Sequence, residues 1–129
     1  MVAIDTNILV RLLTRDSEAD YKASHKLIAA EAIFIPDTVI LETEWVLCYA
    51  YDLTPAEVCD AFRKVFGLGN VHLANGQRVA QALAWHAAGL DFGDAFHLAL
   101  SQGMEVLKTF DKDLIRKSKG LPECRVEKP

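Results

Sequence analysis

The chain has 129 residues, of which 51% are hydrophobic, and its formal net charge at pH 7 is −4. This length suits one domain with a hydrophobic core and is short for two, so we expect a single domain over residues 1–129. The acidic balance excludes a protein that holds nucleic acid through a basic surface alone. It does not exclude a nuclease, because bound divalent metal ions reverse the local charge of an acidic site.

The sequence also bears on location and on the use of cysteine. No apolar run reaches the roughly 18 residues that a membrane span needs, and residues 1–5 do not have the pattern of a signal peptide. The cysteines, Cys48, Cys59 and Cys124, are odd in number and lack the spacing of metal ligands. We therefore expect a cytoplasmic protein whose cysteines are reduced and act as small hydrophobic residues.

The beginning of the chain predicts two short strands separated by helices. Residues 1–4 are typical of a buried strand that turns directly into a helix at Asp5. Residues 17–31 predict an amphipathic helix with Ser17 as its N-cap. Residues 33–35 predict the second strand, which ends before a proline.

Two further helices are expected in the middle of the chain. The first is capped by Asp37 or Thr38, continues to about residue 51 and is expected to be buried on most sides. Thr54 and Glu57 form a capping box with a proline at the first helical position, so the second helix begins there. It is expected to end near the glycines Gly67 and Gly69.

The remaining residues continue the alternation of strands and helices. The elements expected are, in order, a strand over residues 71–73, a helix over 76–88 that stops at Gly89, a helix from 91 that is closed by Gly103, a strand over 106–110, a short basic helix after 111 and an extended piece near 125–126. Such alternation implies crossover connections between parallel strands. We therefore expect an α/β fold with helices on both faces of a parallel sheet.

Acidic residues recur where the predicted strands end. Asp5 ends the first strand, and Asp111 follows the strand over residues 106–110. Asp91 and Asp94 open a helix, and their i, i+3 spacing places both carboxylates on one face of its first turn. Functional residues of parallel α/β folds gather at the carboxyl ends of the strands, so we expect these acids at one edge of the sheet.

Glu42 lies one turn inside a helix that is largely apolar, beside Ile40, Leu41 and Trp45. A carboxylate in such surroundings is costly unless it is paired or binds a cation. Clustered carboxylates suit Mg²⁺ or Mn²⁺ and the hydrolysis of phosphodiesters, because the metal activates water and neutralises developing charge. The neighbouring Glu44 is expected to face solvent.

Each of these acids also has a purely structural interpretation. Asp5 can cap the helix that follows it, Asp91 and Asp94 can form a capping pair, and Asp111 can cap the short basic helix. Glu42 can face solvent or pair with an arginine. Only a shared location favours a metal site, because independent caps have no reason to meet at one edge of a sheet.

Four motifs in order extend the argument to nearly the whole chain. They are AIDTN at residues 3–7, LETEWVL at 41–47, LDFGDA at 90–95 and KTFDKDL at 108–114. With them the sequence resembles the PIN-domain ribonucleases and, within these, the VapC-type toxins of toxin–antitoxin pairs. The resemblance implies a three-layer α/β/α sandwich with a mostly parallel central sheet of four to five short strands. It also implies an endoribonuclease that depends on Mg²⁺ or Mn²⁺.

The resemblance assigns roles to particular residues. Those that match the catalytic, metal-binding acids of the family are Asp5, Glu42, Asp94 and Asp111, with Asp91 at a further acidic position of the toxins. Those that match small polar positions orienting ligands or water are Thr6, Asn7 and Thr109. Hydrolysis by metal-activated water would leave 5′-phosphate and 3′-OH ends. The toxin group further implies a cognate antitoxin protein as partner and a homodimer.

Basic residues near the acids are candidates for contact with RNA. Arg11 and Arg15 share one helix face at i, i+4, and Arg116 and Lys117 lie shortly after Asp111. They suit contacts with RNA phosphates, and a solvated helix face is the alternative.

Histidine and tryptophan are expected to serve structure. The histidines, which lack the spacing of a second ligand, are His25, His72, His86 and His97. Trp45 and Trp85 lie at helical spacing among aliphatic residues, which favours core packing over base stacking. The helices over residues 45–51 and 58–66 carry more apolar surface than one sheet face needs, which is compatible with self-association.

Two other functions remain open. The same metal chemistry would cleave single-stranded DNA, and a nuclease-like fold whose acids only cap helices would be a non-catalytic binding module. A phosphate-receiver domain is disfavoured, because it needs an acidic pair directly after the first strand and a lysine after a later one.

Overall fold

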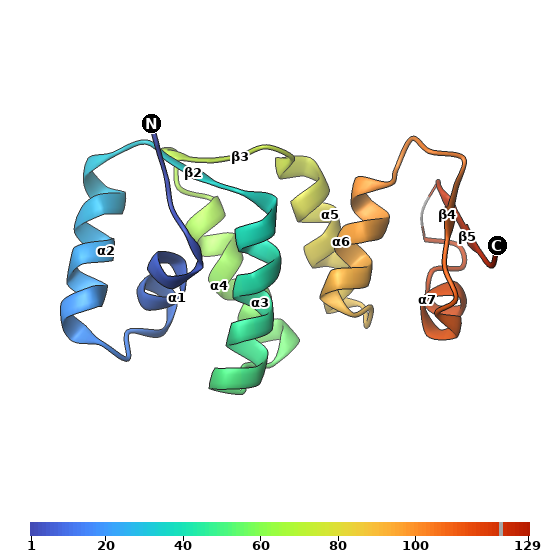
Figure 1. Cartoon of the computed structure of the whole chain (residues 1–129), viewed down its shortest axis with the longest axis horizontal. Helices are drawn as coiled ribbons and strands as arrows, with labels where there is room; N and C mark the ends of the chain where they lie inside the picture. The colour runs from blue at the N-terminus through green and yellow to red at the C-terminus, as the bar shows by residue number, and fades with distance from the viewer. Residues whose placement is uncertain (122) are drawn as a thin grey trace. The chain divides into compact units, whose positions relative to one another are not determined.

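The computed structural model describes residues 1–121 and 123–129 (Figure 1). The chain forms two compact units, an N-terminal unit, Met1–Ala74, and a C-terminal unit, Asn75–Pro129. The expectation of a single domain therefore stays a prediction. Within the described residues, no helix is long and apolar enough to cross a membrane.

The N-terminal unit contains a three-stranded parallel sheet. Its elements in chain order are β1 (Val2–Ala3), α1 (Thr6–Thr14), α2 (Glu18–Ala30), β2 (Ile33–Ile35), α3 (Asp37–Tyr51), α4 (Pro55–Phe66) and β3 (Val71–Leu73). The strand order is β1-β2-β3, with Val2 in register with Ile33 and Ile33 in register with Val71. Each parallel pair of this sheet is joined by two helices, which provide the long crossover that parallel strands need.

The centre of this sheet is β2. Ile33 and Ile35 are fully buried, whereas Val2 and Ala3 of β1 are exposed at the edge of the sheet. Of the predicted strand, residues 1–4, only Ile4 is buried, and it follows β1. The prediction of a buried first strand is therefore wrong, because an edge strand has a neighbour on one side only.

The helix α4 follows its sequence signals closely. The hydroxyl of Thr54 accepts a hydrogen bond from the Glu57 amide at 3.2 Å, and the Thr54 amide donates to the Glu57 carboxylate at 3.1 Å. The helix then buries Val58, Phe62 and Val65 on one face. The predicted capping box is confirmed.

The helix α3 is buried along one face only. Its buried residues are Ile40, Thr43 and Leu47, at a spacing of three and four residues. Trp45 lies two residues from both Thr43 and Leu47 and so faces the other way. Trp45 and Tyr49 are 59% and 74% exposed, and their ring centroids are 5.0 Å apart. The predictions that this helix is buried on most sides and that Trp45 packs in the core are wrong.

The C-terminal unit combines a helical pair with a two-stranded parallel sheet. Its elements are α5 (Gly76–Ala87), α6 (Phe92–Leu100), β4 (Val106–Lys108), α7 (Lys112–Lys117) and β5 (Arg125–Glu127). The helices α5 and α6 pack against each other (Figure 1), and Trp85 and Phe96 are among their buried residues. Burial of Trp85 is as predicted. The strands β4 and β5 pair in parallel, with Val106 opposite Arg125.

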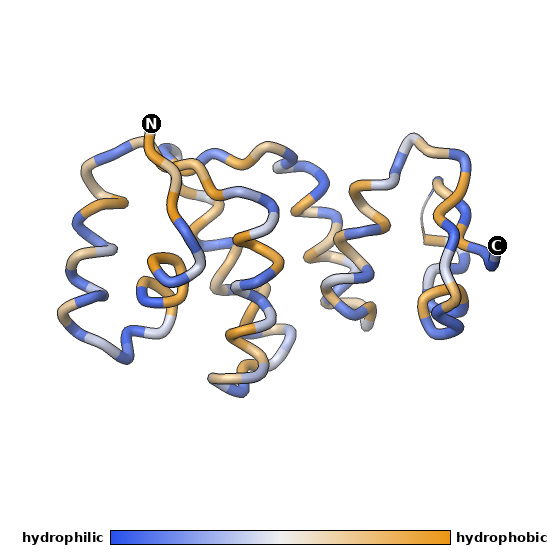
Figure 2. Tube along the Cα trace, in the orientation of Figure 1, coloured by the Kyte–Doolittle hydropathy of each residue, from blue (hydrophilic) through white to orange (hydrophobic). Residues whose placement is uncertain are grey.

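The α/β class is confirmed, because helices alternate with strands and each strand pair of the described residues is parallel. The five strands of the described residues are divided between a three-stranded and a two-stranded sheet, one in each unit, where a single sheet of four to five was expected. Figure 2 shows hydrophobic and hydrophilic positions alternating along the helices, as expected of helices with one buried face.

Candidate active site

Asp5 lies where β1 passes into α1, and it caps that helix. Its Oδ1 atom accepts a hydrogen bond from the Ile8 amide at 3.1 Å. Its Oδ2 atom has no hydrogen-bond partner in the described part of the chain. Capping therefore fixes the carboxylate and leaves one oxygen for another ligand, so the structural and the metal-binding interpretations of Asp5 are compatible.

Glu42 contacts the residue that follows Asp5. The hydroxyl of Thr6, the first residue of α1, donates a hydrogen bond to Oε1 of Glu42 on α3. Glu42 is exposed, whereas Glu44 is half-buried and accepts a hydrogen bond from the Cys48 thiol at 3.4 Å. The predicted environments of these two glutamates are thus reversed. Within the N-terminal unit, Thr6 connects Glu42 to the beginning of α1, where Asp5 lies.

Asn7 has a different environment. It is exposed and lines a pocket of about 260 Å³ between α1 and α2, together with Arg11 and Asp20. No hydrogen bond joins its side chain to Asp5 or Glu42 among the residues that the structure describes. Its predicted role in orienting a ligand stays a prediction.

The C-terminal unit gathers three of the predicted acids. Asp91 caps α6, and its Oδ2 atom accepts a hydrogen bond from the Asp94 amide at 3.2 Å. Burial raises the pKa of Asp94, and the negative charges of Asp91 and Asp111 raise it further. His97 and Lys117 act in the opposite direction on this pKa. The charges of Asp91 and Asp111 therefore both act on the Asp94 carboxylate.

Hydrogen bonds hold both the side chain and the backbone of Asp111. Its Oδ1 atom accepts hydrogen bonds from the amides of Asp113 and Leu114 at 2.9 and 3.1 Å, so it caps α7. The Thr109 hydroxyl accepts a hydrogen bond from the Asp111 amide at 3.0 Å. The Thr109 amide in turn donates to the Glu127 carbonyl at 3.1 Å. Thr109 therefore contacts the backbone of Asp111, and its role in orienting a ligand stays a prediction.

The chemistry of these donors fits a hard divalent cation. Asp94 is half-buried, and its carboxylate has no hydrogen bond or ion pair within residues 1–121 and 123–129. A cation would relieve the repulsion among Asp94, Asp91 and Asp111, and carboxylate oxygens are the ligands that Mg²⁺ and Mn²⁺ prefer. No three acidic, histidine or cysteine side chains of the described residues converge closely enough to enclose an ion.

The candidate RNA-binding residues already have partners. Arg11 pairs with Asp16 at 2.7 Å, and Arg15 pairs with Glu18 at 3.1 Å. The other two contacts join Arg116 to Asp113 at 2.8 Å and the Lys117 ammonium to the Gly89 carbonyl at 3.2 Å. RNA phosphates would have to compete with these contacts, which are exposed and individually weak.

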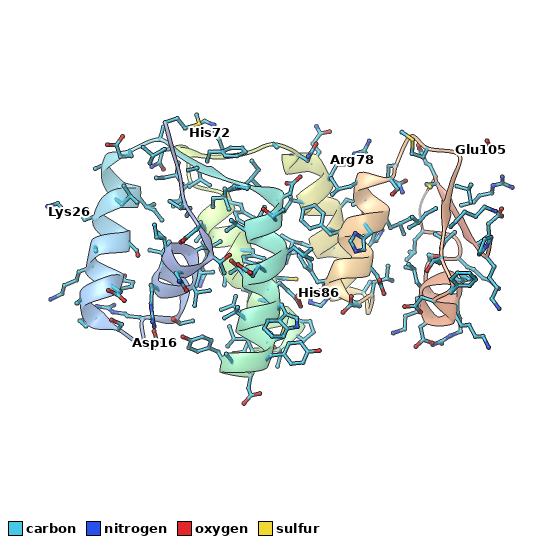
Figure 3. All side chains as sticks on the ribbon, viewed as in Figure 1. Asp16, Lys26, His72, Arg78, His86 and Glu105 are labelled. Carbon is cyan, nitrogen blue, oxygen red and sulfur yellow. The ribbon has the colours of Figure 1, made fainter. Side chains whose placement is uncertain are left out.

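His86, which is labelled in Figure 3, is a buried group that no sequence motif marks as functional. It is 7% exposed, and its Nδ1 atom lies 2.7 Å from the carbonyl oxygen of Leu90, the residue before Asp91. A sequence signal for this contact does exist. It is a histidine in the last turn of one helix, followed by a glycine and then by the acidic cap of the next helix. His97, which is closer to Asp94 in sequence, is exposed.

The chain was compared with known proteins. A family model described as PIN domain matches residues 2–120 and so includes residues of both units. PIN domains are mostly metal-dependent nucleases, which implies a nucleic acid as substrate. No curated protein and no solved structure matches the chain.

Proposed function

Because this chain belongs to the PIN domain family, we propose that it is a cytoplasmic endoribonuclease that depends on Mg²⁺ or Mn²⁺. We propose further that it is the toxin of a VapBC-type toxin–antitoxin pair. The observation that carries the nuclease proposal is the half-buried carboxylate of Asp94, which lacks a partner among the described residues and is repelled by Asp91 and Asp111. Such an arrangement is unfavourable unless a cation binds there.

The proposed metal ligands are Asp5, Glu42, Asp94 and Asp111, with Asp91 as a further ligand. Asp5 and Asp111 each use one carboxylate oxygen as a helix cap, which limits rotation of the side chain and leaves the other oxygen for a cation. A cation held by these residues would supply the Lewis acidity that lowers the pKa of water and neutralises developing charge, and hydrolysis by water would leave 5′-phosphate and 3′-OH ends.

The surrounding polar residues hold the ligands in place. Thr6 donates to Glu42 and so restricts a side chain that is otherwise exposed. Thr109 accepts from the Asp111 amide and fixes the backbone from which that carboxylate projects. Such supporting contacts change metal affinity by about 10-fold to 100-fold when they are removed.

We propose that RNA phosphates contact Arg11, Arg15, Arg116 and Lys117. Each phosphate would replace the partner that the basic side chain now has at the surface. The net contribution of each contact to the free energy of RNA binding is therefore expected to be small. Binding of the RNA chain is then expected to depend on salt, because each phosphate contact releases counterions.

A homodimer and a cognate antitoxin are part of the proposal. The exposed Trp45 and Tyr49 on α3 support self-association, because large exposed aromatic side chains are enriched in protein interfaces. The apolar residues Val58, Phe62 and Val65 of α4 are buried within the chain and do not add to that surface. The proposed self-interface is therefore limited to α3.

The nuclease proposal is tested by cleavage of a mixed RNA pool, with a single-stranded DNA pool in parallel and with mapping of the product ends. We expect cleavage of RNA with Mg²⁺ or Mn²⁺ and a loss of at least about 100-fold in Asp5→Asn and Asp94→Asn. Asp60→Asn, which changes an exposed acid of α4, is the matched control and should cleave as wild type does.

Three outcomes would contradict this proposal. Full activity of both site variants, or activity in excess EDTA, would refute the metal site. Products with 2′,3′-cyclic phosphate would refute hydrolysis by water. Cleavage of DNA alone would favour the DNA nuclease, and binding of RNA without cleavage would favour a non-catalytic module.

A further inference from the structure

The connection between α5 and α6 carries Asp91 and is closed by a Schellman motif. Gly89 has a positive φ of 119°, its amide donates to the His86 carbonyl at 3.0 Å, and the Leu90 amide donates to the Trp85 carbonyl at 3.0 Å. Leu90 and Trp85 are both buried, as the apolar contact of this motif requires. The amides of the connection are therefore satisfied by the backbone of α5.

Two side chains satisfy the carbonyls of the same connection. His86 contacts the Leu90 carbonyl at 2.7 Å, and the Lys117 ammonium donates to the Gly89 carbonyl at 3.2 Å. Because a carbonyl oxygen can only accept, the Nδ1 atom of His86 carries the hydrogen of this contact. Lys117 comes from α7, the helix that Asp111 caps, so two elements bearing proposed ligands meet at this connection.

The buried ring of His86 combines one unsatisfied nitrogen with one polar contact. The ring is buried, contacts the Phe92 ring edge-on at a centroid distance of 5.5 Å, and its Nε2 atom is buried without a hydrogen-bond partner in the described residues. A buried acceptor without a partner is unfavourable compared with a carbon atom in the same place. The feature of His86 that an apolar ring cannot supply is its hydrogen bond to Leu90.

That hydrogen bond acts on the proposed metal ligands through the backbone. The Leu90 carbonyl and the Asp91 nitrogen belong to the same planar peptide group. A hydrogen bond to this oxygen therefore fixes the orientation of the peptide that precedes Asp91. Asp91 then caps α6 by accepting from the Asp94 amide. The connected sequence of contacts runs from His86 through Leu90 and Asp91 to Asp94.

We infer that His86 is a positioning residue, which holds the Leu90–Asp91 peptide so that Asp91 and Asp94 are presented to the metal. This inference rests on the proposed function of those two acids. His86 would then affect metal affinity and kcat because it positions the ligands. It would contact neither the metal nor the RNA.

The test compares two substitutions with opposite properties in the full-length protein. His86→Phe keeps an aromatic ring and removes the donor. It is expected to fold, because loss of the unpartnered Nε2 atom partly offsets the loss of the hydrogen bond to the Leu90 carbonyl. His86→Asn gives up the ring but keeps an N–H donor bonded to Cγ, as Nδ1 is. Mn²⁺ affinity is measured for both by titration, and kcat and KM for RNA are measured separately.

We expect His86→Phe to weaken Mn²⁺ binding about tenfold and to lower kcat with little change in KM. His86→Asn should retain Mn²⁺ affinity within about threefold of wild type. In ¹H–²H exchange of each metal-free protein, the Asp94 amide should exchange faster in His86→Phe than in wild type. A folded His86→Phe protein with wild-type Mn²⁺ affinity and wild-type exchange would overturn the inference.

A second measurement does not depend on the folding of any variant. Long-range ¹H–¹⁵N spectra of the wild-type imidazole should show His86 in the Nδ1–H tautomer, and the Nε2–H tautomer would overturn the inference. A different result would refute the proposed function. If wild type neither binds Mn²⁺ nor cleaves RNA, that function fails, while the tautomer and the Asp94 exchange still test whether His86 holds this connection.

Discussion

The Thr6 hydroxyl donates a hydrogen bond to the Glu42 carboxylate, which joins the first turn of α1 to α3 in the N-terminal unit. Thr6→Val removes this donor at almost constant volume. We expect RNA cleavage to fall about tenfold, because a hydrogen bond to a charged group is worth roughly 1.5–3 kcal/mol and orients a proposed metal ligand. Thr6→Ser keeps the hydroxyl and should retain the wild-type kcat. Equal kcat in Thr6→Val and wild type would show that Glu42 needs no such support.

Asp16 makes the stability of the N-terminal unit depend on pH. Hydrogen bonds from the Tyr51 hydroxyl at 2.5 Å and from Arg11 at 2.7 Å lower the pKa of Asp16 below its usual value of 3.8. A lowered carboxylate pKa contributes stability that is complete above the usual value and is lost as the pH falls through the lower, folded one.

Asp16→Asn should therefore reduce the free energy of unfolding at neutral pH, and its difference from wild type should shrink as the pH falls below about 3.8. Urea denaturation of both proteins over a series of pH values measures this difference. A difference that does not change with pH would contradict the assignment, because it would show that the charge of Asp16 contributes nothing.

Capping and turn signals could be predicted because they depend on neighbouring residues. The capping box of Thr54 and Glu57 lies within four residues of sequence, and Gly89 ends α5 with the positive φ that favours glycine. The sequence predicts caps at Asp5 and Asp111 for the same reason, and both are present. Local geometry alone decides such features.

Features that depend on distant parts of the chain could not be predicted in the same way. Which face of α3 packs inward depends on the elements around it, so the burial of Trp45 was predicted wrongly and the environments of Glu42 and Glu44 are reversed. Strand pairing is also non-local, and the five strands occupy two sheets. The hydrogen bond from Thr6 to Glu42 joins residues 36 positions apart, which no spacing rule indicates.

The capping box provides a prediction about stability that is independent of the candidate active site. Thr54→Ala removes the side chain that accepts from the Glu57 amide, and it should lower the free energy of unfolding by about 1 kcal/mol. Kinetics of RNA cleavage should not change at a temperature where the variant is folded. A stability equal to that of wild type in urea denaturation would show that the cap contributes nothing here.

The exposed pair on α3 gives a prediction about oligomeric state. Trp45 and Tyr49 are the residues expected to be covered when two copies associate, so Trp45→Glu with Tyr49→Glu should convert a dimer to a monomer in sedimentation velocity. Glu57→Gln, on the exposed surface of α4, alters charge elsewhere and should not change the sedimentation coefficient. Dimers that persist in the double variant would exclude this face as the interface.

The central claim is that the acids around Asp94 are arranged for a cation, and thermal unfolding with and without Mn²⁺ tests it directly in wild type and Asp94→Asn. Without metal, Asp94→Asn should be the more stable protein, because it removes a half-buried charge that Asp91 and Asp111 repel. Mn²⁺ at 100 times its Kd should stabilise wild type by about 2.7 kcal/mol and leave Asp94→Asn almost unchanged. Equal stabilisation of both proteins, or of neither, would contradict the claim.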